Sequence, residues 1–387
     1  MTGFRWHPAA RLADGPENST QFQPVIPEQP PGAALAMALA GQGRPFRIGG
    51  LGPAPAPGPQ PMFETLTGGS TGTPRRIRRT QASWTASFAV NAGLFGIGPG
   101  TSSAVLGDLV HSLALYGALE SLHLGAKLHL LGGQRPDRQR QALARVDLLY
   151  ATPTQLRLLT EAIGPEVSLR RLLVGGSKLD ADLRRAIAAM APNAQVHEFY
   201  GAAEASFISL AGPDAPKASV GRAYPGVRIE VRDAGGTPAA EGEIGEIWVQ
   251  SPYLFEAYSG TPGSARWQDG WLSAGEHGRL EAGFLYLSGR AGRMVKIADR
   301  AVYPEQVEAF LQVQPGIVRA AVLPRPDPLR GHHLVALVQG EATDAALLAA
   351  LRQEFGPLVA PKAIQRPDIW PMLPSGKTDL TALARLL

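Results

Sequence analysis

The feature that most constrains the fold is an alternation of short apolar runs with helix-like segments between residues 62 and 202. Runs such as KLHLL, RVDLLYA and RLLVGG have the length of strands and are rich in apolar residues. The segments between them, including SLALYGALESLHLG, TQLRLLTEAIG and DADLRRAIAAMA, have the apolar spacing of helices. Strands that alternate with helices predict an α/β fold, with mixed sheets flanked by helices.

The pattern changes on both sides of this region. After Ala211, the short segments VRIEV, GEIWVQ and GFLYLSG with turn signals between them predict a small barrel-like β subdomain over about residues 212–290. We place a boundary near Arg290–Gly292, and residues 291–387 are expected to form a mobile α+β C-terminal domain. Residues 24–61 are rich in Pro and Gly, which predicts extended connections rather than core, with one short helix at AALAMALAG. The expected divisions are a reduced N-terminal segment (1–61), a core domain (62–290) and the C-terminal domain.

Composition excludes several classes of protein. A chain of 387 residues with 44% hydrophobic and 18% charged residues is expected to be globular, with two or more lobes. It has no cysteine, so disulfides and a cysteine nucleophile are excluded. The start lacks the apolar core of a signal peptide, and no run is long enough to span a membrane, so a cytoplasmic protein is expected. The net charge of +4 favours anionic partners such as nucleotides, coenzyme A or an acidic carrier protein, but is too small to indicate nucleic acid.

A glycine-rich loop, TGGSTGTP at Thr67–Pro74, follows the strand candidate FETLT. Such a loop can turn several N–H groups and hydroxyls toward one anion, and glycines let the backbone approach a phosphate closely. Arg75, directly after the loop, supplies a neutralising charge. The residues expected to bind phosphate are Thr67, Gly68, Gly69, Ser70, Thr71, Gly72 and Arg75.

Two other interpretations of this loop remain open. Gly68–Gly72 also satisfies G-x-S-x-G, which is the nucleophile elbow of serine hydrolases, with Ser70 as the nucleophile. An elbow serine should lead directly into a helix, and Pro74 with the arginines after it fits an immediate helix poorly. A plain surface loop is the third possibility. A Walker A loop is excluded, because no Lys follows Gly72.

Further segments follow the loop in a fixed order, and together they resemble the adenylate-forming superfamily of acyl- and aryl-CoA ligases, peptide-synthetase adenylation domains and luciferases. TGGSTGTPR resembles its phosphate loop, EFYGAAEAS (198–206) its Y-G-x-T-E segment, and GWLSAGEHG (270–278) its G-W-x-x-T-G-D-x-G segment. GRAGRMVKIADRAVYPEQVE (289–308) resembles the hinge region, and LPSGKTDL (373–380) the segment that carries the catalytic lysine. The resemblance covers about Met62 to the C-terminus. It implies that the chain has the fold of this family and uses ATP and Mg²⁺.

The resemblance also implies roles for individual residues. Lys377 would reach the carboxylate and the α-phosphate, while Glu204 with Thr71 would bind magnesium as hard oxygen ligands. Tyr200 would stack on adenine beside Gly201, and Glu276 and Arg290 would hold the ribose. Gly292 would be the hinge. The alternatives that stay open are an exposed loop lysine at 377, a helix-start glutamate at 204 and a half-buried strand tyrosine at 200.

The same resemblance places an acid pocket at His111, Gly175, Gly176 and Ala202. Its apolar surroundings favour a fatty or aromatic monocarboxylate, and the acceptor would be a phosphopantetheine thiol on coenzyme A or a carrier protein. Two departures weaken parts of this expectation. Ala203 replaces the usual Thr of Y-G-x-T-E, and Lys296–Pro304 departs from the segment that lines the thiol tunnel in relatives. A degenerate nucleotide- or acyl-binding protein therefore remains an alternative to an acid–thiol ligase.

Overall fold

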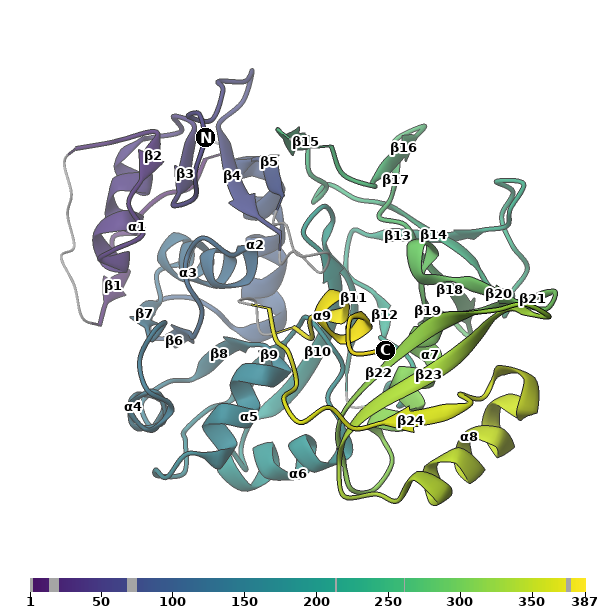
Figure 1. The fold of residues 1–387 in the computed structure, drawn as a ribbon. Coiled ribbons are helices and arrows are strands. Elements are labelled where there is room, and N and C mark those ends of the chain that lie inside the picture. The colour runs from purple at the N-terminus through teal and green to yellow at the C-terminus, as the bar shows by residue number, and fades with distance from the viewer. Residues whose placement is uncertain (1–2, 14–20, 68–74, 213, 261, 374–376) are drawn as a thin grey trace. The chain divides into compact units, whose positions relative to one another are not determined.

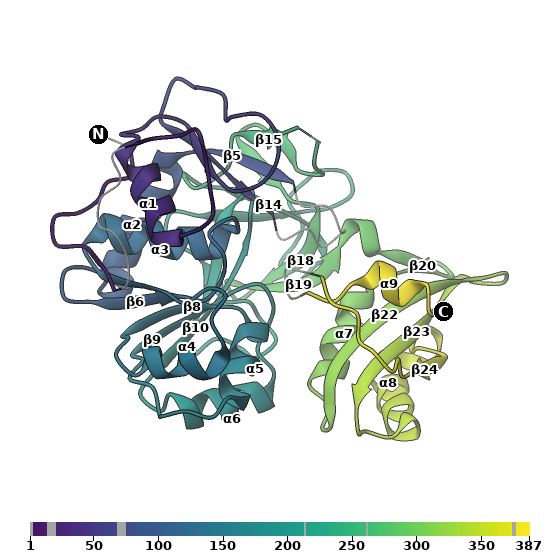
Figure 2. The ribbon, with the colours of Figure 1, turned by 60° about the vertical axis from the view of Figure 1, so that its left-hand side comes forward.

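The computed structural model describes residues 3–13, 21–67, 75–212, 214–260, 262–373 and 377–387. Within these ranges the chain divides into two compact units (Figures 1 and 2). Unit 1 contains the residues up to 67, residues 75–229 and residues 249–272. Unit 2 contains residues 230–248 and the residues from 273 onward. None of the helices in the described ranges is both long and apolar enough to cross a membrane.

The larger sheet of unit 1 has eight strands in the order β1-β7-β6-β8-β9-β10-β11-β12 within the described residues. Neighbouring strands from β1 to β10 run parallel, whereas β11 and β12 join antiparallel at one edge. The predicted mixed sheet is therefore confirmed. The strands are β1 Arg11–Leu12, β6 Ser102–Val105, β7 Lys127–Leu130, β8 Leu148–Ala151, β9 Arg171–Val174, β10 Gln195–Ala202, β11 Ser206–Ala211 and β12 Arg222–Ala223.

Helices cover both faces of this sheet (Figure 1). On one side lie α2 Gln81–Phe95 and α3 Ser112–Leu124, and on the other lie α4 Pro136–Leu143, α5 Pro153–Glu161 and α6 Ala181–Met190. Leu149 and Leu172 from the strands, with Leu156 and Ile187 from the helices, belong to one fully buried apolar cluster. Burying each such side chain contributes about 1.5–3 kcal/mol, so this layer packing stabilises the sheet.

A second, five-stranded sheet in unit 1 has the order β15-β5-β4-β3-β2. Its central strands β4 Met62–Leu66 and β5 Arg76–Thr80 form an antiparallel hairpin. The edge strand β15 Ala257–Ser259 pairs antiparallel with β5, and on the other side lie β3 Phe46–Ile48 and β2 Val25–Ile26. The glycine-rich loop connects β4 to β5, so this sheet carries the predicted phosphate site.

The expectation that residues 24–61 avoid the core is wrong. Helix α1 Pro31–Ala40 confirms the predicted short helix, but the segment also supplies strands β2 and β3. Ile26, Leu35 and Phe46 have no exposed surface, and their side chains pack inside unit 1. Strands of two or three residues are too short for a periodic pattern, which explains why the Pro and Gly content dominated the sequence interpretation.

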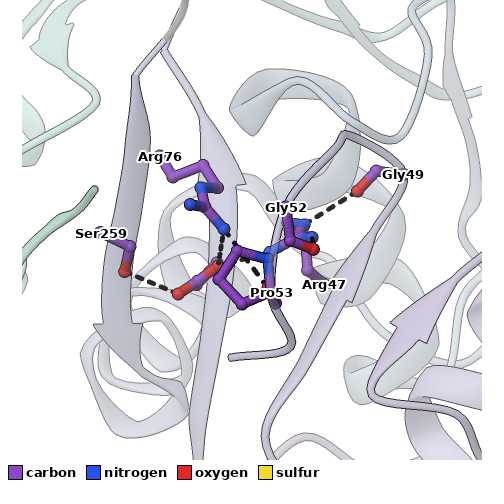
Figure 3. Close-up of polar contacts among 7 residues, drawn as sticks. Arg47, Gly49, Gly52, Pro53, Arg76 and Ser259 are labelled. Atoms are coloured by element: carbon purple, nitrogen blue, oxygen red, sulfur yellow. Dashed lines mark hydrogen bonds and ion pairs between the residues drawn. The ribbon is translucent and has the colours of Figure 1, made fainter. Parts of the chain in front are cut away.

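A buried ion pair ties this Pro- and Gly-rich segment to the hairpin (Figure 3). Arg47 on β3 is fully buried, and its Nη1 lies 2.9 Å from Oε2 of Glu64 on β4. Glu64 also accepts a hydrogen bond of 2.6 Å from Ser259 on β15, and Arg76 on β5 lies 3.9 Å from it. The remaining donors of Arg47 bind the carbonyl oxygens of Gly49, Gly52 and Pro53. A buried charge with all its partners in place specifies one arrangement of these strands.

A further sheet of six strands has the order β16-β17-β14-β18-β19 among the described residues, with β13 paired to β14. Its strands are β13 Arg228–Arg232, β14 Gly245–Gln250, β16 Arg266–Gln268, β17 Trp271–Ser273, β18 Glu276–Glu281 and β19 Phe284–Arg290. This sheet is the β-rich region expected after Ala211.

The C-terminal part of unit 2 is α+β, as predicted. A short 3-10 turn, Ala291–Arg293, and a hairpin of β20 Val295–Ile297 and β21 Arg300–Val302 lead into it. The sheet order is β22-β23-β24, with β22 Ile317–Asp327, β23 Gly331–Gly340 and β24 Ala363–Gln365. The helices are α7 Pro304–Gln312, α8 Asp344–Val359 and α9 Leu380–Ala384. Val307, Val322 and Leu351 lie in its buried core.

Candidate active site

The glycine-rich loop closes the β4–β5 hairpin. The Thr67 N–H donates to the Arg75 carbonyl oxygen at 2.9 Å, and the Arg75 N–H donates to Thr67 Oγ1 at 3.0 Å. Gly68, Gly69, Ser70, Thr71 and Gly72 lie outside the described residues. A nucleophile elbow needs a strand that turns directly into a helix, whereas this loop joins two antiparallel strands. The structure therefore contradicts the context that a Ser70 hydrolase requires.

The backbone at His111 lies beside the strand that enters this loop. The Leu66 N–H donates to the Val110 carbonyl oxygen at 3.2 Å, and Leu66 and His111 form a parallel bridge. Ser112 strengthens the attachment, because its hydroxyl donates to the Leu66 carbonyl oxygen at 3.3 Å. His111 is thus placed at the start of α3, next to the end of β4.

Tyr200, Gly201 and Ala202 lie where β10 turns back into β11. Tyr200 is half-buried and opposite Ser209, and the register shifts between Tyr200 and Gly201. A Cβ on Gly201 would lie 2.2 Å from the Ser206 carbonyl oxygen, so only glycine fits this close approach. Glu204 follows on the turn between the two strands, and not at a helix start.

Gly175 and Gly176 follow β9 directly, at the carboxyl end of the parallel strands. The ring of Phe199 on β10 packs on Gly175, because a Cβ there would lie 2.2 Å from Cζ of the ring. Gly176 has a φ of +100°, which favours glycine. This edge of the sheet thus brings the two glycines next to the strand that carries Tyr200 and Ala202.

Tyr258 on β15 is a candidate site residue that no sequence pattern indicated. Its hydroxyl donates to Oε1 of Glu204 at 2.7 Å, and the Phe255 N–H donates to the Glu204 carbonyl oxygen at 2.8 Å. Burial, followed by the charge of Glu204, raises the pKa of Tyr258 well above its usual range, so the hydroxyl remains a donor. Arg75 acts on that pKa in the opposite direction, which places the exit of the loop within electrostatic reach of Tyr258.

Arg79 is a second missed residue. It is 1% exposed and donates to the Ala203 carbonyl oxygen at 3.1 Å and to Ser206 Oγ at 2.7 Å. A third bond of 2.8 Å reaches the carbonyl oxygen of Tyr253. Burial lowers the pKa of Arg79 to about 9, and Glu204 partly opposes this. At neutral pH the guanidinium is therefore charged, and it anchors both sides of the turn that carries Glu204.

In unit 2, the structure brings Glu276 and Arg290 together. They are directly opposite each other on β18 and β19, with 3.5 Å between Arg290 Nε and Glu276 Oε1. The pair sits next to the turn Ala291–Arg293, whose first N–H donates to the Gly275 carbonyl oxygen at 2.8 Å. The two residues expected to hold the ribose thus form one cross-strand pair.

The remaining two predicted residues of unit 2 are accessible. Gly292 lies in the 3-10 turn, and a Cβ placed there would meet nothing within 4 Å. Lys377 is exposed and follows Pro374–Gly376, which lie outside the described residues. The Leu373 N–H donates to the Lys377 carbonyl oxygen at 2.8 Å, and Met372 and Thr378 form an antiparallel bridge, so the backbone of Lys377 is held against that of Leu373.

Comparison with known proteins identifies the class. Residues 16–259 match the family model described as AMP-binding enzyme, and residues 306–377 match the model described as AMP-binding enzyme C-terminal domain. The chain belongs to the AMP-binding enzyme family. The first match begins at residue 16, so it includes the whole Pro- and Gly-rich segment 24–61.

Individual relatives agree with this membership. The chain is similar to YhfT of Bacillus subtilis, described as an uncharacterized acyl-CoA ligase, with 34% identity over 84% of this chain and 68% of YhfT. It is also similar to VraA of Staphylococcus aureus, described as a putative long chain fatty acid-CoA ligase, with 29% identity over 72% of this chain and 60% of VraA. The matches therefore span between 60% and 68% of the length of these two relatives.

Solved structures share the fold. ATP-bound MatB from Rhodopseudomonas palustris superposes with a TM-score of 0.75 at 22% identity, covering 94% of this chain and 78% of MatB. MenE from Bacillus subtilis, described in complex with ATP and magnesium ion, gives a TM-score of 0.71 at 23% identity, covering 83% of this chain and 69% of MenE.

Proposed function

We propose that this chain is an ATP-dependent acid–thiol ligase. It activates a carboxylic acid as an acyl-adenylate, releases pyrophosphate, and passes the acyl group to the phosphopantetheine thiol of coenzyme A or of a carrier protein. The proposal depends on one observation in this member of the AMP-binding enzyme family. In unit 1, residues of β5 and β15 connect the glycine-rich hairpin to the turn that carries Glu204.

The first step joins two anions. A carboxylate oxygen attacks the α-phosphorus of ATP, the bond from that phosphorus to the β-phosphate's bridging oxygen breaks, and pyrophosphate leaves. Positive groups must offset the repulsion and the charge that spreads over the transition state. In this proposal Arg75 and the loop residues Thr67–Gly72 hold the β- and γ-phosphates, and Lys377 contacts the carboxylate and the α-phosphate.

The adenine and the ribose of ATP are assigned to two further sets of predicted residues, one in β10 and one in β18 and β19. Tyr200 on β10 offers a half-buried ring for adenine, with Gly201 as its neighbour on the same strand. The cross-strand pair Glu276 and Arg290 offers an acceptor and a donor for the ribose hydroxyls. Gly292 would allow rotation between the adenylation and transfer steps, because glycine tolerates large changes in φ and ψ.

The described residues fit a magnesium ion that is held mainly by ATP. No group of three or more His, Asp or Glu side chains among them could hold a metal. A single carboxylate with phosphate oxygens and water is a common environment for Mg²⁺, and Glu204 supplies such a carboxylate. When bound, the ion would offset the charge of the triphosphate. Thr71 is the second proposed ligand, and Ala203 contributes no hydroxyl here.

For the acid we propose a fatty or aromatic monocarboxylate, bound near His111, Gly175, Gly176 and Ala202. The ring of Phe199, packed on Gly175, makes this edge of the sheet apolar. In the second step the thiol sulfur attacks the acyl carbonyl carbon, the bond to the phosphate oxygen breaks, and AMP leaves. The proton of the thiol goes to solvent or to a base.

The test is acid-dependent exchange of pyrophosphate into ATP, measured over a panel of fatty, aryl and amino acids. Exchange with a fatty or aryl acid, followed by AMP release and thioester formation on adding coenzyme A or a carrier protein, is expected. Tight ATP binding without exchange for any acid would instead favour a degenerate binding protein. Labelling of Ser70 by a fluorophosphonate probe would revive the hydrolase.

A further inference from the structure

Strand β15 is attached to both strands of the phosphate-loop hairpin. In its antiparallel ladder with β5, Tyr258 lies opposite Ile77 and Ser259 opposite Arg76 (Figure 3 shows the latter two side chains). The Ser259 hydroxyl reaches past β5 and donates to Glu64 on β4 at 2.6 Å. The position of β15 is therefore fixed relative to β4 and β5, the two strands that the loop connects.

The same segment also holds Glu204 at two points. The Phe255 N–H binds its carbonyl oxygen at 2.8 Å, and the Tyr258 hydroxyl binds its Oε1 at 2.7 Å. Arg79 from β5 fixes the residues on either side, through the Ala203 carbonyl oxygen and Ser206 Oγ. The main chain of the turn is thus anchored without Tyr258, whereas Tyr258 acts on the carboxylate itself.

We infer that Tyr258 is a positioning residue that fixes the Glu204 carboxylate relative to the phosphate loop, holding Oε1 and leaving Oε2 for the cation that accompanies ATP. This inference rests on the proposed function. Among the described residues, Oε2 of Glu204 has no hydrogen-bond partner, and no other side chain donates to Oε1.

The physical advantage is preorganisation. A glutamate side chain has several rotatable bonds, and ordering it at the moment of binding costs conformational entropy. Without the phenol, more rotamers are accessible to the Glu204 carboxylate before the ligand binds. Tyr258 holds the carboxylate in one orientation before the ligand arrives, so less of the binding free energy is lost to ordering.

The experiment compares ATP affinity with Mg²⁺ and with EDTA by calorimetry, using the full chain and the variant Tyr258→Phe. Loss of one hydrogen bond to a charged group predicts about tenfold weaker binding in the presence of Mg²⁺ and little change in EDTA. The matched control is Tyr286→Phe, because Tyr286 is a half-buried tyrosine of unit 2 whose hydroxyl has no hydrogen-bond partner among the described residues.

A double-mutant cycle with Glu204→Gln identifies the group through which Tyr258 acts. If Tyr258 works through the carboxylate, Tyr258→Phe has no further effect on Mg²⁺-dependent ATP binding once Glu204 is replaced. Equal weakening with and without Mg²⁺, or additive effects of the two substitutions, would overturn the inference and indicate a merely structural phenol.

The inference and the proposed function fail in different ways. Wild-type protein that binds ATP with Mg²⁺ but shows no exchange with any acid would refute the ligase. The double-mutant cycle of Tyr258 and Glu204 would still test the positioning role of Tyr258. Normal exchange together with an unchanged Mg²⁺ response in Tyr258→Phe would refute the positioning role alone. Wild-type protein that does not bind ATP with Mg²⁺ would refute both.

Discussion

The two units carry different kinds of candidate site residue. In unit 1, Glu204 sits on a turn that is held by the buried guanidinium of Arg79 and by Tyr258. In unit 2, Lys377 is exposed, and the pair of Glu276 and Arg290 lies on strands with the arginine side chain 47% exposed. Unit 1 therefore offers charges that buried hydrogen-bond partners hold in place, whereas unit 2 offers two exposed cations, Lys377 and Arg290, and one carboxylate, Glu276, that is 18% exposed.

This difference separates stability from activity. A substitution at a buried, multiply bonded residue changes the free energy of unfolding as well as the site, because its former partners lose their hydrogen bonds. A substitution at an exposed residue leaves the fold almost unchanged, since surface interactions contribute about 0–1 kcal/mol. Variants of the buried residues in unit 1 should therefore change stability more than activity, and variants of the exposed residues in unit 2 should change activity more than stability.

The largest effect on activity is expected in unit 2. Lys377→Ala should lower acid-dependent pyrophosphate exchange by about three orders of magnitude, equivalent to about 4 kcal/mol of transition-state stabilisation. The reason is that the proposal gives no other described residue the role of contacting both the carboxylate and the α-phosphate. The Tm of the variant should stay within about 1 °C of wild type. Lys217→Ala, an exposed lysine of unit 1, is the control and should retain activity. A Lys377→Ala variant with near-normal exchange would remove this residue from the proposed site.

The largest effect on stability is expected in unit 1. Arg79→Met should lower the free energy of unfolding by about 3–5 kcal/mol, since it strips partners from the Ala203 and Tyr253 carbonyl oxygens and leaves Glu204 without a nearby buried cation. Urea denaturation measures this loss. Arg185→Met, in a surface pair with Asp182, should cost less than about 1 kcal/mol. Equal losses in the two variants would break the comparison between buried and exposed charges.

A smaller effect is expected at the ribose pair. Glu276→Gln and Arg290→Lys should each raise the KM for ATP about tenfold, which corresponds to losing one charge-assisted hydrogen bond of about 1.4 kcal/mol. Thermal melts should be unchanged within about 2 °C. Steady-state exchange kinetics at varied ATP concentration distinguish a change in KM from a change in kcat. A pronounced loss of stability would show that this pair is structural.

A different kind of effect, on stability alone, is a pH dependence within unit 1. Glu120 is fully buried, accepts hydrogen bonds from Tyr150 and Asn91, and faces Tyr116. Burial raises the pKa of Glu120 to about 7 from 4.5, although the hydrogen bonds oppose this. The folded state thus favours the protonated acid, and the resulting stabilisation is complete below about pH 4.5 and lost as the pH rises through about 7.

Glu120→Gln should remove this contribution. Between pH 5 and pH 8 the Tm of wild type should fall more steeply than that of the variant, as measured by thermal melts in a pH series. Glu161→Gln, an exposed glutamate on α5, should keep the wild-type slope. Identical slopes in all three proteins would mean that Glu120 is not the titrating group.

Much of the fold follows from periodicity. Every strand and helix predicted between residues 62 and 202 is present, because each is long or apolar enough to show its spacing. Helix α4 was missed, since PDRQRQAL buries only Gln139 and Leu143 and so has almost no apolar face to detect. The strands before Met62 were missed for a related reason: each has only two or three residues.

The candidate site was predictable only in part. The glycine-rich loop, Glu204 and Lys377 carry order and spacing along the chain, so they can be found without a structure. Arg79 appeared as one member of a basic run, although the alternation in RIRRT already places Ile77 and Arg79 on the same face of a strand. What no local pattern reveals is that its acceptors include the Tyr253 carbonyl oxygen, 174 residues away.

That separation has a consequence for how the protein is made. The phosphate-loop hairpin is synthesised early, but its edge strand and the hydroxyl that binds Glu64 come from a part of the chain 195 residues later. Contacts of this kind form only after a long loop has closed. A ribosome-bound chain that stops short of residue 253 would hold the Arg79 cation without its most distant acceptor. Ribosome-release and limited-proteolysis experiments should thus find protection of the hairpin only once β15 has emerged.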